Sequence, residues 1–318
     1  MFETVATNLV TLCVLIIIGF IAEKAGFVSE KASAALSDVL IKIALPSTIL
    51  MSMQKPFSSE LLIDGGIALG LSLVIYFASY PIGLLLCKIM RVKWPDAGVW
   101  TCALMFPNVG FMGIPVLNAI YGPDVLFFVS MNNVVFNIMI SSFGISVLKR
   151  GSRAAKQTGD KNADERARKK SIKRFIPNIV VMSTIIGFIL FLLSVKIPGP
   201  VAAAFNMAGS MTTPLSMVII GAMLSRGGVF KALTGAKEYA HILVKLLVMP
   251  VIVYFAVSPF VGNKLILDSL VLLTAMPVAT MNAIFAVKYG SNGFLASRLV
   301  ALSTVLSIIT LPIVSLLL

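Results

Sequence analysis

The sequence is poor in charged residues and in the residue types that most catalytic and metal sites use. Aspartate, glutamate, lysine and arginine together make up 12% of the 318 positions, against roughly a quarter in ordinary soluble domains. There is one histidine, His241, and the three cysteines are dispersed in apolar stretches. No glycine-rich nucleotide-binding loop is present. These absences argue against an enzyme, a metal centre, a disulfide framework and ATP-driven transport by this chain, and no cofactor is expected.

Long apolar runs dominate the sequence instead. Apolar residues make up 58% of the chain, and the mean hydropathy is +0.99. Runs of about 20 apolar residues, enough to cross the hydrocarbon core of a bilayer, recur along nearly the whole chain. The predicted fold class is therefore an all-α polytopic membrane protein with ten transmembrane helices. The spans are predicted at about residues 5–23, 31–53, 61–88, 97–121, 124–148, 175–195, 199–225, 232–258, 264–288 and 292–318.

Matching landmarks in the two halves of the chain indicate a duplicated unit. The landmarks recur at offsets of 168 to 170 residues, in the pairs Pro46 and Pro214, Pro81 and Pro250, Pro107 and Pro277, and Tyr121 and Tyr289. Five spans per half is an odd number, so the second half enters the membrane from the opposite side, and the repeat is predicted to be inverted. The predicted divisions are a first repeat over residues 1–150, a basic linker over 151–174 and a second repeat over 175–318.

Basic residues are distributed very unevenly between the joins. The joins after odd-numbered spans hold 21 lysines and arginines, whereas those after even-numbered spans hold only Lys55, Lys196 and Lys264. Because cytoplasmic loops carry the excess of basic residues, the central loop is predicted to be cytoplasmic and both termini external, in the plasma membrane. The basic linker either contacts anionic lipid headgroups or only sets orientation. Binding of nucleic acid is not expected.

The fourth and ninth predicted spans contain breaks at matching places. In the fourth span, Pro107, Gly110, Gly113 and Pro115 fall within nine residues, which predicts two half-helices separated by an extended stretch. Asn108 can offer its amide beside the exposed backbone. The ninth span has Pro277 without a glycine pair, so a shorter break is expected there. The alternative is a pair of proline kinks that serve packing only, which membrane helices tolerate.

Such breaks suit the recognition of charge. The N-terminus of a half-helix presents unpaired N–H groups and a partial positive charge near the middle of the membrane, where a carboxylate can bind. The pattern therefore favours small organic anions as substrates, although the opposing C-termini could hold a cation. Any driving force must come from gradients of the substrate, of protons or of sodium.

The motifs Leu45-Pro46, Pro107-Asn108-Val109-Gly110-Phe111-Met112-Gly113-Ile114-Pro115 with Tyr121-Gly122, and Met276-Pro277 with Tyr289-Gly290-Ser291-Asn292 together resemble the auxin efflux carrier family. This family includes the plant auxin carriers and bacterial permeases for malonate or malate. The resemblance covers essentially the whole chain. The short central loop is closer to a bacterial permease, which implies location in the bacterial inner membrane.

The resemblance implies two inverted five-helix repeats, with spans four and nine crossing at their prolines to form the substrate site. The plant carriers have an Asn-Pro-Asn type sequence at the crossing, where this chain has Phe106 before Pro107 and has Met276 and Val278 around Pro277. A homodimer is the assembly implied by analogy. The expected substrate-binding residues are Pro107, Asn108, Gly110, Pro277, Thr280, Asn282, Ser47 and Thr48.

Three ionisable residues inside or near predicted spans are candidates for coupling or anion pairing. Asp38 and Lys42 are spaced to form an ordinary i, i+4 ion pair, and Lys42 could instead extend toward the cytoplasmic surface. His241 could carry a proton, or it could be an ordinary interfacial histidine in contact with water. The remaining functional alternative is a transporter-like membrane receptor or sensor, which would need a signalling domain that the short linker does not provide.

Overall fold

The computed structural model describes residues 2–94, 96–156, 179–226 and 235–318. Every regular element in this part of the chain is helical, as predicted, and the single β contact is an isolated bridge between Pro107 and Val278. The elements are α1 (Phe2–Lys24), α2 (Glu30–Val39), η1 (Leu40–Ala44), α3 (Leu45–Ser52), α4 (Ser59–Ile89), α5 (Asp96–Met105), η2 (Val109–Gly113), α6 (Ile114–Tyr121), η3 (Pro123–Val125), α7 (Leu126–Met139), η4 (Ile140–Gly144), α8 (Ile145–Lys156), α10 (Ile179–Leu192), α11 (Gly199–Ser210), α12 (Thr212–Arg226), α14 (Ala236–Leu243), η5 (Val244–Val248), α15 (Met249–Val257), η6 (Ser258–Phe260), α16 (Lys264–Ala275), α17 (Thr280–Lys288) and α18 (Gly293–Ser315).

Six continuous helical segments in the described residues are long and apolar enough to cross a membrane. They are Glu30–Ser52, Ser59–Ile89, Pro123–Arg150, Gly199–Ser225, Ala236–Phe260 and Gly293–Ser315. Two shorter apolar helices, Val109–Tyr121 and Ile179–Leu192, accompany them. An ordinary span needs about 20 apolar residues, so the six segments support an integral membrane protein. The predicted fourth and ninth spans each consist of two short helices.

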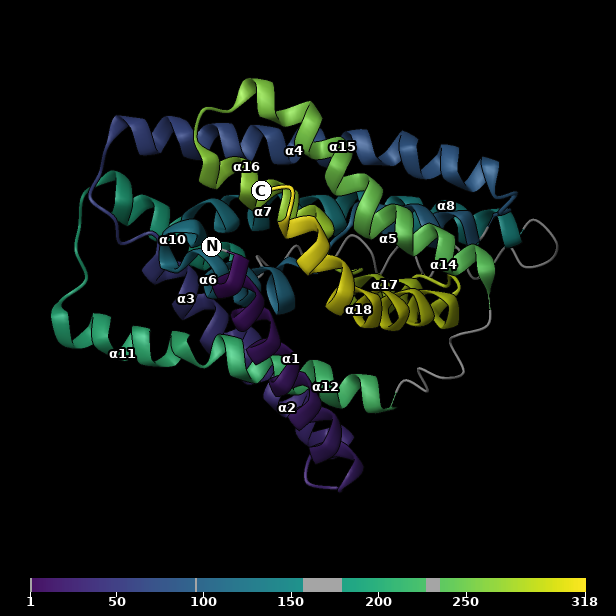
Figure 1. Cartoon of the computed structure of the whole chain (residues 1–318), viewed down its shortest axis with the longest axis horizontal. Coiled ribbons are helices and arrows are strands. Elements are labelled where there is room, and N and C mark those ends of the chain that lie inside the picture. The colour runs from purple at the N-terminus through teal and green to yellow at the C-terminus, as the bar shows by residue number, and fades with distance from the viewer. Residues whose placement is uncertain (1, 95, 157–178, 227–234) are drawn as a thin grey trace.

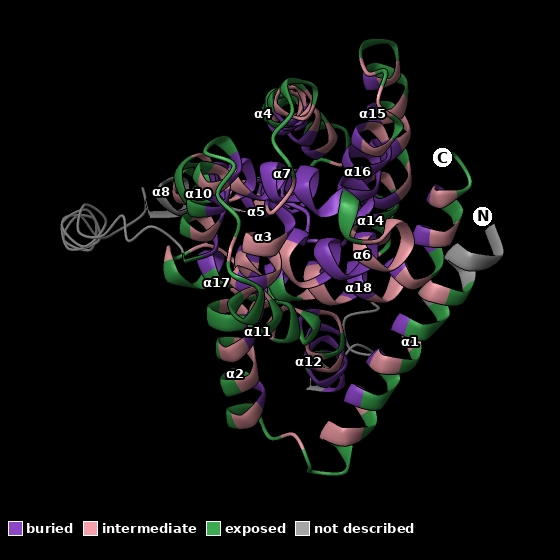
Figure 2. Ribbon diagram, turned by 90° about the vertical axis from the view of Figure 1, so that its left-hand side faces the viewer, coloured by how far each residue is buried: buried purple, intermediate pink, exposed green. Residues whose placement is uncertain are grey.

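The packing separates a buried centre from an apolar exterior. Figure 1 shows α4 and α15 on one side of the molecule, α11 and α12 on the opposite side, and α7 and α16 between them. The central helices are almost entirely buried, and the outer helices are not (Figure 2). The side chains exposed on α4 are large and apolar, including Ile63, Val74 and Ile89. Exposed apolar side chains on a long helix are the expected lipid-facing surface.

Three prolines inside helical segments are accommodated by a widened turn. The π-helical turns η1, η2 and η5 come immediately before the helices that carry Pro46, Pro115 and Pro250 in their first turn. A proline has no N–H and its ring clashes with the carbonyl four residues earlier. A π-turn inserts one extra residue, which absorbs this misfit without ending the helix. The interruptions at Pro46 and Pro250 are therefore local, unlike those at Pro107 and Pro277.

The helices α1 and α12 pack at a close crossing made by glycine (Figure 1). A Cβ atom added at Gly221 would lie 1.9 Å from the carbonyl oxygen of Ile16, and one added at Gly19 would lie 2.2 Å from that of Val218. These distances leave no room for any side chain. Backbone-to-backbone contact of this kind depends on small residues, which membrane helix interfaces favour.

The predicted division into two repeats and a basic linker stays a prediction. The helix α8 continues to Lys156, beyond the predicted end of the first repeat at residue 150. The remainder of the predicted basic linker, residues 157–174, lies outside the described residues. Its predicted contact with lipid headgroups therefore stays a prediction.

Candidate functional site

The breaks of the two interrupted segments lie directly against each other. The N–H of Asn108 donates to the carbonyl oxygen of Pro277 at 2.7 Å, and the N–H of Ala279 donates to that of Phe106 at 3.0 Å. These two bonds form the antiparallel bridge between Pro107 and Val278. Each extended stretch thus provides hydrogen-bond partners for backbone groups of the other. Backbone groups buried in a membrane need such partners. The predicted meeting of the two proline-marked breaks is observed.

The lengths of the breaks differ from the expectation. In the first, only Phe106 to Asn108 is non-helical, because the glycines and Pro115 belong to η2 and α6. The extended stretch is therefore shorter than the nine residues that the sequence suggested. In the second, Met276 to Ala279 is non-helical, so this break is not the shorter of the two. The π-turn η2 explains the first difference, since it accommodates residues that would otherwise leave the helix.

Side chains from several elements satisfy the helix ends around the crossing. The Oδ1 atom of Asn108 accepts a hydrogen bond from the N–H of Phe111 at 3.2 Å and caps η2. The Oγ atom of Ser303 on α18 accepts from the N–H of Val278 at 3.0 Å. The Nζ atom of Lys245 on η5 donates to the carbonyl oxygen of Thr274 at 2.8 Å. These contacts satisfy the start of η2, the end of α16 and the extended stretch between α16 and α17.

Two cavities open beside the N-termini of the second half-helices. The first, the polar cavity, has a volume of about 100 Å³; the second, the apolar cavity, has a volume of about 230 Å³. Asn108 and Thr280 line both. The polar cavity is also lined by Ile41, Leu45, Gly110, Phe111, Asn133, Phe136, Asn137, Val180, Ala279 and Met281, and the apolar cavity by Ile220, Met223, Leu224, Ala283, Ile284, Ser297, Val300, Ala301 and Thr304.

Several hydrogen-bond donors lie at these cavities. Among the described residues, no acceptor is found for the backbone N–H of Gly110 or Thr280, or for the amide nitrogen of Asn108. No charged side chain lines either cavity. The N-termini of α17 and of the η2–α6 helix add a partial positive charge of about half an elementary charge each. The arrangement suits one bound anion.

The structure gathers six of the predicted site residues at the crossing. Pro107 and Pro277 lie in the two extended stretches, and Asn108, Gly110 and Thr280 line the cavities. Asn282 lies in the first turn of α17, where it is 1% exposed, and its amide nitrogen has no partner in the described chain. It lines neither cavity.

Ser47 and Thr48 lie on α3, away from the linings of both cavities. The hydroxyl of Ser47 donates to the carbonyl oxygen of Ile43 at 2.7 Å. The hydroxyl of Thr48 is 2.8 Å from that of Thr212 and donates to the carbonyl oxygen of Gly209 at 3.0 Å. These bonds tie α3 to α11 and α12. A role for either residue in binding substrate stays a prediction.

The candidate coupling residues also lie outside the cavities. Lys42 and Asp38 form the expected i, i+4 ion pair at 2.7 Å, with both side chains more than half exposed. Their pairing is confirmed, and a surface pair of this kind contributes little stability. His241 is fully buried, with Nε2 3.0 Å from the carbonyl oxygen of Trp100. The alternative of an interfacial histidine in contact with water is therefore wrong, and a role in coupling stays a prediction.

Three residues that matter at the crossing were not selected from the sequence. Asn133 and Asn137 line the polar cavity, although an asparagine in an apolar span more often serves packing between helices. Their neighbour Asn132 does serve packing, because it bonds Tyr76 and Ser72 of α4. Lys245 reaches the crossing from the π-turn η5. The sequence contained a signal for Lys245, because a lysine in the middle of an apolar span needs a partner and is a candidate functional residue.

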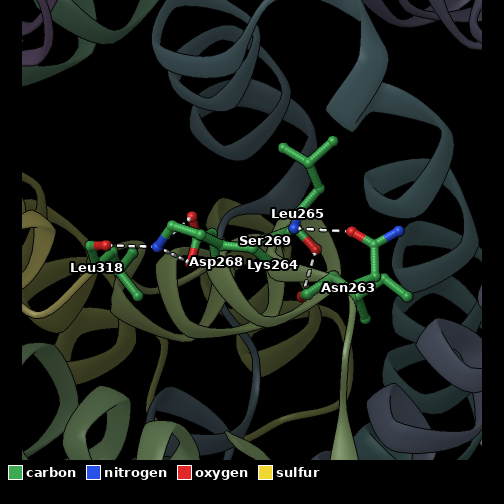
Figure 3. Close-up of polar contacts among 7 residues, drawn as sticks. Asn263, Lys264, Leu265, Asp268, Ser269 and Leu318 are labelled. Carbon is green, nitrogen blue, oxygen red and sulfur yellow. Dashed lines mark hydrogen bonds and ion pairs between the residues drawn. The ribbon is translucent and has the colours of Figure 1, made fainter. Parts of the chain in front are cut away.

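A further polar cluster ties the start of α16 to Leu318, which follows α18 (Figure 3). Lys264 pairs with the buried carboxylate of Asp268 at 3.3 Å and donates to the backbone oxygen of Leu318 at 2.5 Å. The Oδ1 atom of Asn263 caps the helix by accepting from the N–H of Leu265 at 3.0 Å. These residues line neither cavity. Within the described residues no cluster of histidine, cysteine and acidic side chains could hold a metal ion.

Comparison with known proteins agrees with these features. The chain is 24% identical to an uncharacterized transporter of Methanocaldococcus jannaschii over 94% of each protein. It is also 24% identical to the uncharacterized transporter YfdV of Escherichia coli K12, over 96% of this chain and 95% of that protein. A further uncharacterized transporter, from Methanothermobacter thermautotrophicus, is 24% identical over 96% of each. The family model described as "Membrane transport protein" matches residues 4–315. The chain therefore belongs to this membrane transport family, that of the auxin efflux carriers.

Proposed function

We propose that the chain is a secondary transporter or facilitative carrier of small organic anions, and that it works by alternating access around the crossing. The observation that carries the proposal is the set of donors at the two cavities. Two helix N-termini, the amide of Asn108 and the hydroxyl of Thr280 converge there. Carboxylates bind to such groups without needing a buried cationic side chain.

The cavities favour a single carboxylate on an apolar body. Two half-helix N-termini supply about one elementary charge between them, which matches one carboxylate. The apolar cavity, with Ile220, Leu224 and Ile284 in its lining, would then take the rest of the molecule. A dicarboxylate such as malonate or malate would bring a second charge to a site whose described lining has no basic side chain. Leaving that charge unpaired costs free energy.

The proposed architecture behind this site is the pair of inverted five-helix repeats. It would have ten spans, with the broken α5–α6 and α16–α17 segments as the fourth and ninth, and the bridge between the two breaks supports this arrangement. The excess of basic residues on one side supports a cytoplasmic central loop, external termini and location in a bacterial inner membrane. Membrane lipids surround the assembly, and a homodimer is proposed by analogy with the family.

Alternating access would follow from the contacts at the crossing. The breaks are held together by two backbone hydrogen bonds and by side chains from neighbouring helices, so they form a fixed centre. Movement of the surrounding helices against this centre would expose the cavities to one side of the membrane and then to the other. Gradients of the substrate, of protons or of sodium would drive net movement.

We expect an apolar monocarboxylate to stabilise the purified protein more than a dicarboxylate does. A ligand that binds the native state raises its apparent melting temperature. The test compares indole-acetate, malonate and malate in a thermal-shift assay, followed by uptake into proteoliposomes. Thr280→Val, which removes one donor, should weaken binding about fivefold, since a hydrogen bond contributes about 1 kcal/mol.

The matched control is Thr11→Val, because Thr11 is exposed on α1 and its hydroxyl bonds only the carbonyl oxygen of Thr7. This variant should bind as the wild type does. If no carboxylate shifts the melting temperature or enters the vesicles, the proposed function is wrong. If malonate binds best, the proposal that the chain carries organic anions is retained, but the proposed preference for a single carboxylate is wrong.

A further inference from the structure

Lys245 is a buried basic side chain at the opposite side of the crossing from the two cavities. It lies in the π-turn η5, is 1% exposed, and is among the largest fully buried side chains described. Its Nζ atom donates to the carbonyl oxygen of Thr274 at 2.8 Å. A lysine almost never occupies a fully buried position without a specific partner, so its role must lie in what it contacts.

The carbonyl that Lys245 binds belongs to the C-terminus of α16. The last four carbonyl groups of a helix have no partner within the helix, and Thr274 carries one of them, since α16 ends at Ala275. In a continuous helix the carbonyl oxygen of Thr274 would accept from the N–H of Val278. At the break this N–H donates to the Oγ atom of Ser303 instead. Lys245 thus satisfies an acceptor that the interruption of the helix creates.

The C-terminus of α5 meets the same place. A cavity of about 10 Å³, roughly the space of one water molecule, lies between the two helix ends. Leu104 and Met105 of α5 line it on one side, Leu273 and Thr274 of α16 on the other, and Lys245 between them. The lining is completed by Ile75, Tyr76, Ser79, Pro107 and Asn132.

The charges at this place balance. Each helix C-terminus carries about half a negative elementary charge, so two of them together equal one monovalent cation. Two such ends facing each other without a cation would be unfavourable in the low dielectric of a membrane interior. Carbonyl oxygens, a hydroxyl and an amide oxygen are also the ligands that free sodium prefers over nitrogen donors.

We propose that the ammonium group of Lys245 is a resident cation, occupying the place where a free monovalent cation would otherwise bind. The crossing then needs no cation from solution to hold its two negative helix ends together. Combined with the proposed function, this makes the carrier independent of sodium. The occupancy of the site by Lys245 does not itself depend on which substrate the cavities bind.

The test is the thermal stability of the full-length purified protein in chloride salts of sodium, ammonium, methylammonium or choline at equal ionic strength. The wild type should melt at the same temperature in sodium and in choline. Lys245→Ala opens space for a small cation. In choline it should melt lower by about 5 °C or more, and small cations should raise its melting temperature in a saturable manner.

Two further variants sharpen the comparison. Lys245→Met removes the charge but fills the space, so it should melt low in every salt. Lys42→Ala removes an exposed lysine and should show no dependence on the cation. The inference is overturned if the wild type melts lower in choline than in sodium, or if Lys245→Ala melts as the wild type does or is rescued by no cation. The comparison of the wild type in choline and in sodium tests the inference even if the variants do not fold.

Uptake measured in parallel separates this inference from the proposed function. Wild-type uptake of indole-acetate should be equal in sodium and choline. If no carboxylate is carried but the melting temperature of Lys245→Ala still depends on small cations, the role of Lys245 as resident cation is supported and the proposed function is wrong. If carboxylate uptake is present and requires sodium, the proposed function is supported and the role of Lys245 as resident cation is wrong.

Discussion

Asn108→Asp should lower the affinity for carboxylates by about a hundredfold or more while leaving the fold intact. The Oδ1 atom of Asn108 caps η2 by accepting from the N–H of Phe111, and aspartate is an equally good capping residue at a helix N-terminus. The same change replaces a donor that faces both cavities with a negative charge. Like charges placed together cost several kcal/mol, and about 3 kcal/mol corresponds to a hundredfold.

The measurement is binding and uptake of whichever of indole-acetate, malonate and malate stabilises the wild type most, together with the melting temperature without ligand. Asn108→Ser keeps a capping oxygen without a charge and should lose only about fivefold, the value of one donor. Ser58→Asp, an acidic N-cap on the exposed start of α4, should change neither property. Wild-type affinity in Asn108→Asp would show that the anion binds elsewhere.

Gly221→Val should strongly destabilise the protein. An added Cβ at Gly221 would lie 1.9 Å from the carbonyl oxygen of Ile16 and 2.8 Å from the nitrogen of Phe20. Both atoms are backbone, so no side chain can move aside and α1 must separate from α12. Overpacking costs about 1–3 kcal/mol even where side chains can adjust. A melting temperature lower by about 5 °C or more is expected, with loss of folded protein on size-exclusion chromatography.

Gly66→Val provides the matched control. Gly66 lies on α4, and an added Cβ there would meet nothing within 4 Å. It carries the same change of residue in another apolar helix, so any effect of β-branching on the helix itself is shared. Equal melting temperatures for the two variants would contradict the close crossing of α1 and α12.

Much of the candidate site could be predicted from the sequence because proline disturbs the helix at its own position in the chain. Pro107 and Pro277 each remove a hydrogen-bond donor, and their matching places in the two halves of the chain predicted a break at each. Asn108 also acts locally, since its side chain caps the helix three residues away. Thr280 and Gly110 were found for the same reason, since they follow the breaks directly in the chain.

The residues that complete the site were harder to find because their partners are distant in sequence. Lys245 binds a carbonyl 29 residues away, and Ser303 accepts from an N–H 25 residues away. Asn133 and Asn137 reach the polar cavity only because α7 packs beside the crossing. Conversely, Thr48 has a suitable side chain beside a proline, yet its helix directs it to α11 and α12.

The long apolar runs of the sequence alone determined that this chain is a helical membrane protein, because a helix satisfies its own backbone groups within the bilayer. The sequence also marks, by Pro107 and Pro277, the two points where the backbone leaves the helix. Which groups meet there was decided by folding: the N–H of Asn108 donates to the carbonyl oxygen of Pro277, and Lys245 donates to that of Thr274. Such pairings depend on how separate helices pack, and packing joins residues that no local rule of sequence connects.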